Sequence, residues 1–302
     1  MKAIKRFFRY DNLGWLFVLP ALIYMLALTG WPIISNLILS LQDVTVRTIR
    51  LPNKPFVGLK NYQTLFAGGV LTDAIVNTLV FTVFCLIFQF VLGFVLALFF
   101  NRKFTTAKFV RGLLMMPWMI PITVTALMFK FIFGTDVGIL NQALVALGVI
   151  ARPIEWLTQP TTAMIALIIA NVWIGIPFNM ILLSVGLSTV PQELYESASI
   201  DGANAWQSFW HITLPMIRPS IESVLILGFI YTFKVFDLVF VMTGGGPVNS
   251  TQMLSTYSYK QSFSMFKYSE GAAIANVLLV VLMIASVIYL KFAYSDEQEG
   301  AR

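Results

Sequence analysis

The sequence predicts an all-α membrane protein with six transmembrane helices, a cytoplasmic N-terminus and a short cytoplasmic helix between the fourth and fifth spans. Three observations lead to this fold class. Charged residues are few, six apolar runs have spanning length, and one long connection between two of these runs carries a polar, patterned sequence.

The composition excludes an ordinary soluble domain. Of the 302 residues, 58% are hydrophobic and only 11% are charged, and the mean hydropathy is +0.81. Soluble globular domains carry about 25% charged residues. The formal net charge is +6, but the charges flank apolar runs and form no basic stripe interleaved with exposed aromatic residues. This pattern indicates lipid as the surrounding medium and argues against nucleic acid as a partner.

Six apolar runs are long enough to cross a bilayer, which takes about 20 residues as a helix. They cover residues 13–41, 74–100, 112–134, 161–188, 220–243 and 272–292. The first run is longer than the apolar part of a signal peptide and lacks a small-residue cleavage site, so we expect it to be a retained span. Prolines inside the runs predict kinked helices, because neighbouring groups can satisfy the freed carbonyls. These prolines are Pro20, Pro32, Pro117, Pro121 and Pro177.

The distribution of lysine and arginine predicts the orientation. With the N-terminus inside, the inner segments hold Lys2, Lys5, Arg6, Arg9, Arg102, Lys103, Lys108, Arg111, Arg218, Lys291 and Arg302. The outer loops hold Arg47, Arg50, Lys54, Lys60, Arg152, Lys260 and Lys267. The larger inner set follows the rule that short cytoplasmic segments are enriched in positive charge.

The connection over residues 190–219 is too long and too patterned for a simple turn. Thr189 can cap a short helix that Pro191 starts, with Glu193 in its first turn. Gly202 can end this helix, because glycine enters the left-handed conformation without steric cost. A second amphipathic stretch carries aromatic residues suited to a membrane interface, namely Trp206, Phe209 and Trp210.

The short helix has the character of a docking element for a partner protein. Ser197, Ala198 and Ser199 are small and allow close approach. Its acidic residues run against the positive bias expected on the inner face. These acidic residues are Glu193, Glu196 and Asp201.

The same residues carry a resemblance to a known family. Glu196-Ser197-Ala198, Gly202 six residues after the glutamate, and Ile212-x-Leu214-Pro215 resemble the EAA loop of binding-protein-dependent ABC transporter permeases. One departure is Ser197, where the motif has its first alanine. Asp201-Gly202-Ala203, the three aromatic residues that follow, and the stretch from Asp237 to Thr243-Gly244-Gly245-Gly246-Pro247 are similar to the carbohydrate-importing branch, which includes maltose, glycerol-phosphate and lactose permeases. The large extra outer domain of some members is absent here.

This resemblance implies one permease domain over residues 1–302 in the bacterial cytoplasmic (inner) membrane. It implies a heterodimer with a second, homologous permease, two ATP-binding subunits that carry ATP and Mg, and an extracytoplasmic solute-binding protein that delivers a sugar. The chain itself would bind no cofactor and catalyse no reaction. The residues that couple it to the ATPase would be Glu196, Ser197, Ala198, Asp201 and Gly202. The alternative is that Glu196 is a solvated helix residue and Gly202 a simple helix cap.

The fourth predicted span contains candidate substrate-binding residues. Asn171, Gly175 and Asn179 recur every fourth residue and therefore share one helix face, flanked by Trp173 and Phe178. Amides can bind the hydroxyl groups of a sugar, and aromatic rings can cover its C–H faces. The alternative is helix–helix packing, in which glycine and asparagine are also favoured.

The fifth predicted span adds Tyr231, Lys234 and Asp237. Charged groups at membrane depth are costly, so each is a functional candidate. Lys234 and Asp237 are three residues apart, which on a continuous helix would allow an ion pair. They would otherwise line a cavity and bind sugar hydroxyls, or Lys234 would hold an anionic sugar derivative.

Other function classes find less support in the sequence. His211 and Cys85 are the only histidine and cysteine, so no metal cluster is expected. Gly244-Gly245-Gly246-Pro247 lacks the Lys-Ser or Lys-Thr of a phosphate loop. No catalytic constellation is visible. The alternative function is an ion-gradient-driven secondary transporter of a small polar solute, for which inverted repeats would be expected.

Overall fold

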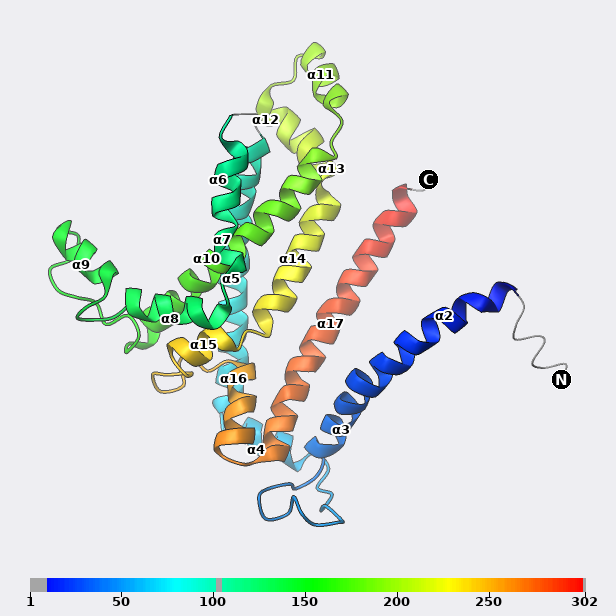
Figure 1. Ribbon diagram of the computed structural model, residues 1–302, viewed down its shortest axis with the longest axis vertical. Helices are drawn as coiled ribbons and strands as arrows, with labels where there is room; N and C mark the ends of the chain where they lie inside the picture. Colours follow the sequence, from blue (N-terminus) through cyan, green and yellow to red (C-terminus); the bar gives the residue numbers. More distant parts are fainter. Residues whose placement is uncertain (1–9, 102–104, 301–302) are drawn as a thin grey trace. The chain divides into compact units, whose positions relative to one another are not determined.

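The computed structural model describes residues 10–101 and 105–300. This part of the chain is helical and contains no strand, only two isolated bridges, Gln42 with Phe56 and Thr45 with Lys267. The helices, labelled in Figure 1, are α2 (Tyr10–Met25), η1 (Leu26–Gly30), α3 (Trp31–Ser40), α4 (Lys60–Ala67), α5 (Val70–Asn101), α6 (Ala107–Leu114), α7 (Met116–Met119), α8 (Ile122–Ile132), α9 (Ile139–Ala146), α10 (Pro160–Ser188), α11 (Gln192–Ile200), α12 (Ala205–Ser208), η2 (Phe209–Thr213), α13 (Leu214–Met216), α14 (Arg218–Phe233), α15 (Asp237–Met242), α16 (Leu254–Tyr259), η3 (Lys260–Ser264) and α17 (Tyr268–Gly300).

Four helical stretches within the described residues are long and apolar enough to cross a membrane. They are Phe17–Ser40, Val70–Asn101, Pro160–Ser188 and Tyr268–Lys291. Two further pairs of helices are long and apolar enough only when each bent pair counts as one span, which gives up to six spans. The helical fold class is therefore confirmed, and the span count lies between four and six.

The third predicted span, residues 112–134, is broken rather than merely kinked. The segment Ala107–Met119 meets Ile122–Ile132 at 95°. Pro121 lacks an N–H donor, and the residue before a proline is pushed out of the helical region. Ile120 accordingly has an extended backbone, with φ −77° and ψ 133°.

The prediction of one fifth helix over residues 220–243 is wrong. Helix α14 already begins at Arg218 and stops at Phe233, and a new helix, α15, starts at Asp237. No proline lies in this break. The segment Ala205–Met216 also meets α14 at 64°.

The side on which the N-terminus lies stays a prediction. Several of the basic residues on which it depends lie outside the described residues, namely Lys2, Lys5, Arg6, Arg9, Arg102, Lys103 and Arg302.

The chain divides into two compact units. The first comprises residues 1–67 and 258–276, and the second comprises residues 68–257 and 277–302. Polar side chains in the first unit join the end of α3 to the start of α17. Asn36 Nδ2 donates to Asn276 Oδ1 at 2.7 Å, Asn276 Nδ2 donates to the Tyr62 hydroxyl at 3.1 Å, and that hydroxyl donates to Ser40 Oγ at 2.9 Å. Such hydrogen bonds hold membrane helices together, because apolar helix surfaces pack against lipid about as favourably as against one another.

In the second unit, α5 packs against both α10 and α14 (Figure 1). At the closest approach, a Cβ added to Gly93 of α5 would lie 2.5 Å from the Cβ of Asn179 on α10. Buried apolar residues pack on both sides of this level. Phe81, Phe129 and Leu167 belong to one cluster, and Ala97, Met180 and Leu183 belong to the other.

We predict that Gly93→Leu lowers the free energy of unfolding by about 1–3 kcal/mol, because the added side chain forces α5 away from α10. Thermal unfolding in detergent measures this. The matched control is Gly112→Leu on α6, where a Cβ has no neighbour within 4 Å. Equal stability of the two variants would contradict the close approach of α5 and α10.

Candidate functional site

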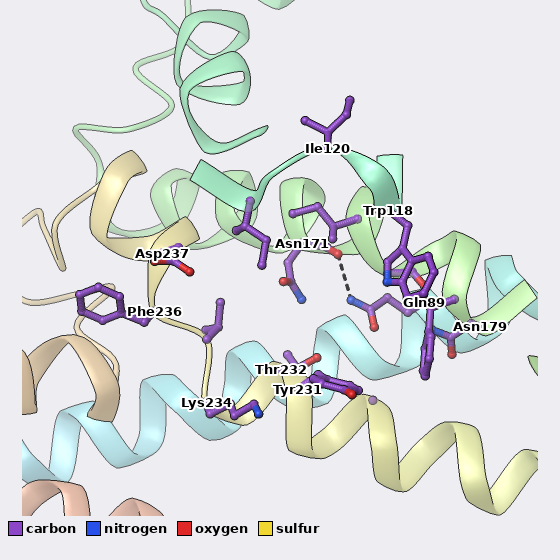
Figure 2. A pocket seen from close by; sticks show the side chains of 16 residues that line it. Gln89, Trp118, Ile120, Asn171, Asn179, Tyr231, Thr232, Lys234, Phe236 and Asp237 are labelled. Carbon is purple, nitrogen blue, oxygen red and sulfur yellow. Dashed lines mark hydrogen bonds between the residues drawn. The ribbon is translucent and has the colours of Figure 1, made fainter. Parts of the chain in front are cut away.

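A cavity of about 450 Å³ lies in the second unit, at the level where the two apolar clusters separate. Its wall comes from α5, α7, the start of α8, the middle of α10, the end of α14 and the break before α15 (Figure 2). The lining residues are Gln89, Trp118, Ile120, Ile122, Asn171, Ile174, Gly175, Phe178, Asn179, Gly228, Tyr231, Thr232, Lys234, Val235, Phe236 and Asp237.

Helix α10 presents its polar stripe to this cavity. Asn171, Gly175 and Asn179 line it from successive turns, as their four-residue spacing predicts. Gln89 of α5 crosses this face, and its Nε2 donates to the backbone carbonyl of Asn171 at 3.0 Å (Figure 2). A Cβ at position 175 would lie 2.3 Å from the Gln89 side chain, so glycine there leaves room for the crossing.

Three aromatic side chains from three elements form one part of the wall. The ring centroids of Trp118 and Phe178 are 6.1 Å apart, and those of Phe178 and Tyr231 are 6.0 Å apart at 84°. Such edge-to-face and tilted contacts fix the rings relative to one another. The cavity therefore combines a rigid apolar surface with amide groups, a combination suited to a small ligand that has both polar edges and apolar faces.

The break between α14 and α15 places two opposite charges on the cavity wall. The Lys234 amine lies 5.1 Å from the centroid of the Tyr231 ring, within the range of a cation–π contact. Lys234 is the C-cap of α14 and Asp237 begins α15, so the two residues do not share one continuous helix.

Seven of the eight residues predicted to bind substrate line the cavity, and Trp173 does not. Two residues after Asn171, Trp173 projects about 200° around the helix from it. Its ring contacts Phe129 instead, at 5.5 Å between centroids. Among the lining residues that our sequence analysis missed, Trp118 lies between Pro117 and Pro121, and a broken apolar helix is a signal for a binding site.

The predicted short helix forms as α11, and Gly202 ends it as expected. Gly202 has φ +83°. The Ala203 N–H donates to the Ala198 carbonyl at 2.9 Å and the Gly202 N–H donates to the Ser199 carbonyl at 3.2 Å, the paired bonds of a Schellman motif. The prediction that Thr189 caps this helix is wrong: its hydroxyl donates to the Gly186 carbonyl at 2.7 Å and closes α10, while Pro191 is the N-cap of α11.

Helix α11 presents its acidic and small residues outward. Glu196, Ser197, Asp201 and Gly202 are exposed, and Ala198 is half-buried. On the other side of the helix, the Tyr195 hydroxyl shares a hydrogen bond of 2.8 Å with Thr213 Oγ1 of η2.

The aromatic stretch that follows α11 anchors the loop. The Phe209 ring packs on Phe94 of α5 with centroids 5.9 Å apart, and Trp206 and Trp210 pack on Phe209. A capping box between Asn204 and Gln207 starts α12. The loop is therefore a built surface and not a loose connection.

Residues 89–295 match the family of binding-protein-dependent transport system inner membrane components. The chain belongs to this family of permeases. The matched residues of the permease include both the cavity and α11. Family membership places the permease in the inner membrane, as a subunit of a transporter and not as an enzyme.

Relatives match the permease over nearly its whole length. It is 34% identical to the trehalose/maltose transport system permease protein MalF of Thermococcus litoralis, over 94% of each chain. It is 34% identical to the lactose transport system permease protein LacF of Rhizobium radiobacter, over 98% of each chain. A solved bacterial ABC transporter involved in the import of the acidic polysaccharide alginate contains a chain with a TM-score of 0.77 and 27% identity, covering 96% of the permease and 98% of that chain.

We predict that Tyr195→Phe loosens α11 without unfolding the permease. Loss of one partly buried hydrogen bond costs about 1 kcal/mol, so amide hydrogen exchange in α11 should accelerate about fivefold. Exchange in α5 and α10 should stay unchanged. Tyr24→Phe, at an exposed position, is the control. Unchanged exchange in α11 would show that the bond to Thr213 does not hold the helix.

Proposed function

We propose that this permease forms half of the membrane channel of an ATP-driven importer for a sugar or sugar derivative, and that the cavity is its substrate site. The relatives named for trehalose, maltose and lactose support the substrate class. The lining of the cavity fits it. Asn171 and Asp237 supply hydrogen-bonding groups, and the three aromatic rings supply apolar faces. Asn179, whose Nδ2 donates to the Gly175 carbonyl, adds its amide oxygen.

The observation that carries the proposal is the continuity of α10. This helix of 29 residues lines the cavity near its middle and ends at Ser188, four residues before α11 begins at Gln192. Movement of α11 therefore reaches the cavity through one helix. The hydrogen bond between Tyr195 and Thr213 joins α11 to η2. Because η2 leads through α13 to α14, α11 also moves with the start of α14.

Coupling to the ATPase occurs, in this proposal, through Glu196, Ser197, Ala198, Asp201 and Gly202. Small residues permit close approach of the ATPase surface, and the carboxylates supply charge-assisted hydrogen bonds to it. ATP and Mg bind to two partner subunits, which perform the hydrolysis, and this chain binds no cofactor. The N-terminus and α11 lie in the cytoplasm, on the side of the ATPase.

The remaining partners follow from the same assembly. A second, homologous permease completes the channel as a heterodimer, and an extracytoplasmic solute-binding protein delivers the sugar. A solved alginate transporter in complex with its periplasmic binding protein, to which the permease is similar with a TM-score of 0.78 and 26% identity, supports such a delivery step. The alternative, an ion-gradient-driven carrier, has no use for an exposed docking helix at the end of α10.

Glu196→Lys and Gly202→Asp should each reduce the ATPase that co-purifies with the importer by about tenfold or more, equal to about 1.4 kcal/mol of binding free energy. The first variant reverses a charge in the docking surface, and the second places a side chain at φ +83° where glycine is needed. The measurement is co-purification in mild detergent, followed by an ATP hydrolysis assay.

The matched control for the charge reversal is Asp136→Lys, in the connection between α8 and α9, which should retain the ATPase. Retention of the ATPase by all three variants, together with intact transport, would favour the gradient-driven alternative.

Substitutions in the cavity should impair sugar recognition but leave the assembly intact. We predict that Asn171→Leu and Tyr231→Ala each raise the sugar concentration for half-maximal stimulation of ATP hydrolysis about tenfold, because a polar or aromatic contact worth about 1.4 kcal/mol is removed. The control is Trp173→Phe, which lies off the cavity. A larger effect of the Trp173 substitution than of the other two would place the substrate elsewhere.

A further inference from the structure

Helix α9 and its flanking residues form an uncharged surface segment. Residues 137–151 contain no aspartate, glutamate, lysine or arginine, and Asp136 and Arg152 bound the run. Apolar side chains in this run are widely exposed: Val137 and Leu147 at 76%, Ile139 at 66% and Val149 at 65%. A connection in water normally carries polar residues at such positions.

One buried side chain, that of Asn141, bonds backbone groups that flank the two ends of this segment. Asn141 is 2% exposed. Its Nδ2 donates to the carbonyls of Thr135 at 3.0 Å and Ile154 at 2.9 Å, and its Oδ1 accepts from the Ile154 N–H at 3.1 Å and the Trp156 Nε1–H at 3.0 Å. The amide thus closes the segment into a loop whose two ends meet.

The end of α9 is closed in the same way. Gly148 has φ +68°. The Val149 N–H donates to the Leu144 carbonyl at 2.9 Å, and the Gly148 N–H donates to the Val145 carbonyl at 3.0 Å. This Schellman motif satisfies carbonyls that a helix end otherwise leaves to water.

Helix α9 follows α8 in the chain and contacts it (Figure 1), and α8 also carries exposed apolar side chains. On α8, Val124, Leu127 and Phe131 are exposed, the last at 74%. The Trp156 ring lies 5.5 Å from the Phe133 ring and joins the closed loop to the end of α8. Both helices therefore carry exposed apolar side chains.

We propose that α9 and residues 137–151 lie in the lipid bilayer, at the interface of the outer leaflet. Lipid offers no hydrogen bonds, so a segment that enters it must satisfy its backbone internally. The Asn141 amide satisfies backbone groups at the base of the segment, and the Schellman motif at Gly148 satisfies carbonyls at the end of α9.

The proposal requires only that the permease is a membrane protein, and it stands whether or not a sugar binds in the cavity. Only the assignment to the outer leaflet rests on the proposed orientation. Contact of α9 with lipid would fix the C-terminal end of α8. The first residue of α8, Ile122, lines the cavity.

The test places a fluorophore on α9. Leu147→Cys is labelled with an environment-sensitive dye, and the assembled importer is placed in phosphatidylcholine–phosphatidylglycerol nanodiscs. The one natural cysteine, Cys85, is fully buried, so the labelled parent gives the background. Quenching by a lipid that carries a nitroxide near its glycerol backbone is compared with quenching by iodide in the water.

We expect nitroxide lipid to quench the dye at position 147 more strongly than iodide does, with a blue-shifted emission. Val149→Cys should behave alike, which guards against an effect of one substitution on folding. Val248→Cys, 95% exposed in the turn after Gly244–Pro247, is the control and should be quenched mainly by iodide.

Quenching of α9 by iodide alone would show that the segment lies in water. Protection from both quenchers would show that another protein chain covers it. Either result overturns the proposal.

Discussion

The cavity depends on how closely α5 and α10 approach each other. Gly93 removes the side chain that would collide with Asn179, and Gly175 removes the one that would collide with Gln89. Two glycines, one on each helix, therefore bring the polar groups of both helices to the same level. In a membrane, where apolar surface gains little by leaving lipid, such close packing and interhelical hydrogen bonds drive helix association. The two buried apolar clusters, one on either side, then enclose this layer of polar groups.

The rest of the wall comes from helices that do not continue. The break at Pro121 turns the chain so that Trp118 and Ile122 both face the cavity. The break after Phe233 does the same for Lys234 and Asp237. Irregular backbone is tolerated at membrane depth only where protein or a polar cavity satisfies it. Cavity and breaks are thus mutually dependent: the breaks supply polar groups, and the cavity gives those groups an environment other than lipid.

The sequence predicted what depends on local spacing and missed what depends on packing. The stripe of Asn171, Gly175 and Asn179 follows from helical periodicity, and the start of α11 at Pro191 and its end at Gly202 follow from backbone preferences. The break after Phe233 has no proline or glycine to announce it. It arises where Phe233 is fully buried and α15 packs on α8, contacts between residues about 100 positions apart. The 95° angle at Pro121 is likewise set by tertiary contacts, since proline alone specifies only that the helix is interrupted.

Pro177 divides the cavity-lining face of α10. Asn171 and Gly175 lie before it, and Phe178 and Asn179 lie after it, on the part of the helix that leads to α11. From Asn179 to Ser188 the helix rises by roughly 14 Å, short enough to move as one rigid body. Because Pro177 lacks the N–H that would tie it to the preceding turn, α10 bends there more easily than elsewhere. Any tilt that α11 imposes on this end of the helix therefore moves Phe178 and Asn179 relative to Asn171 and Gly175, and so alters the shape of the cavity itself.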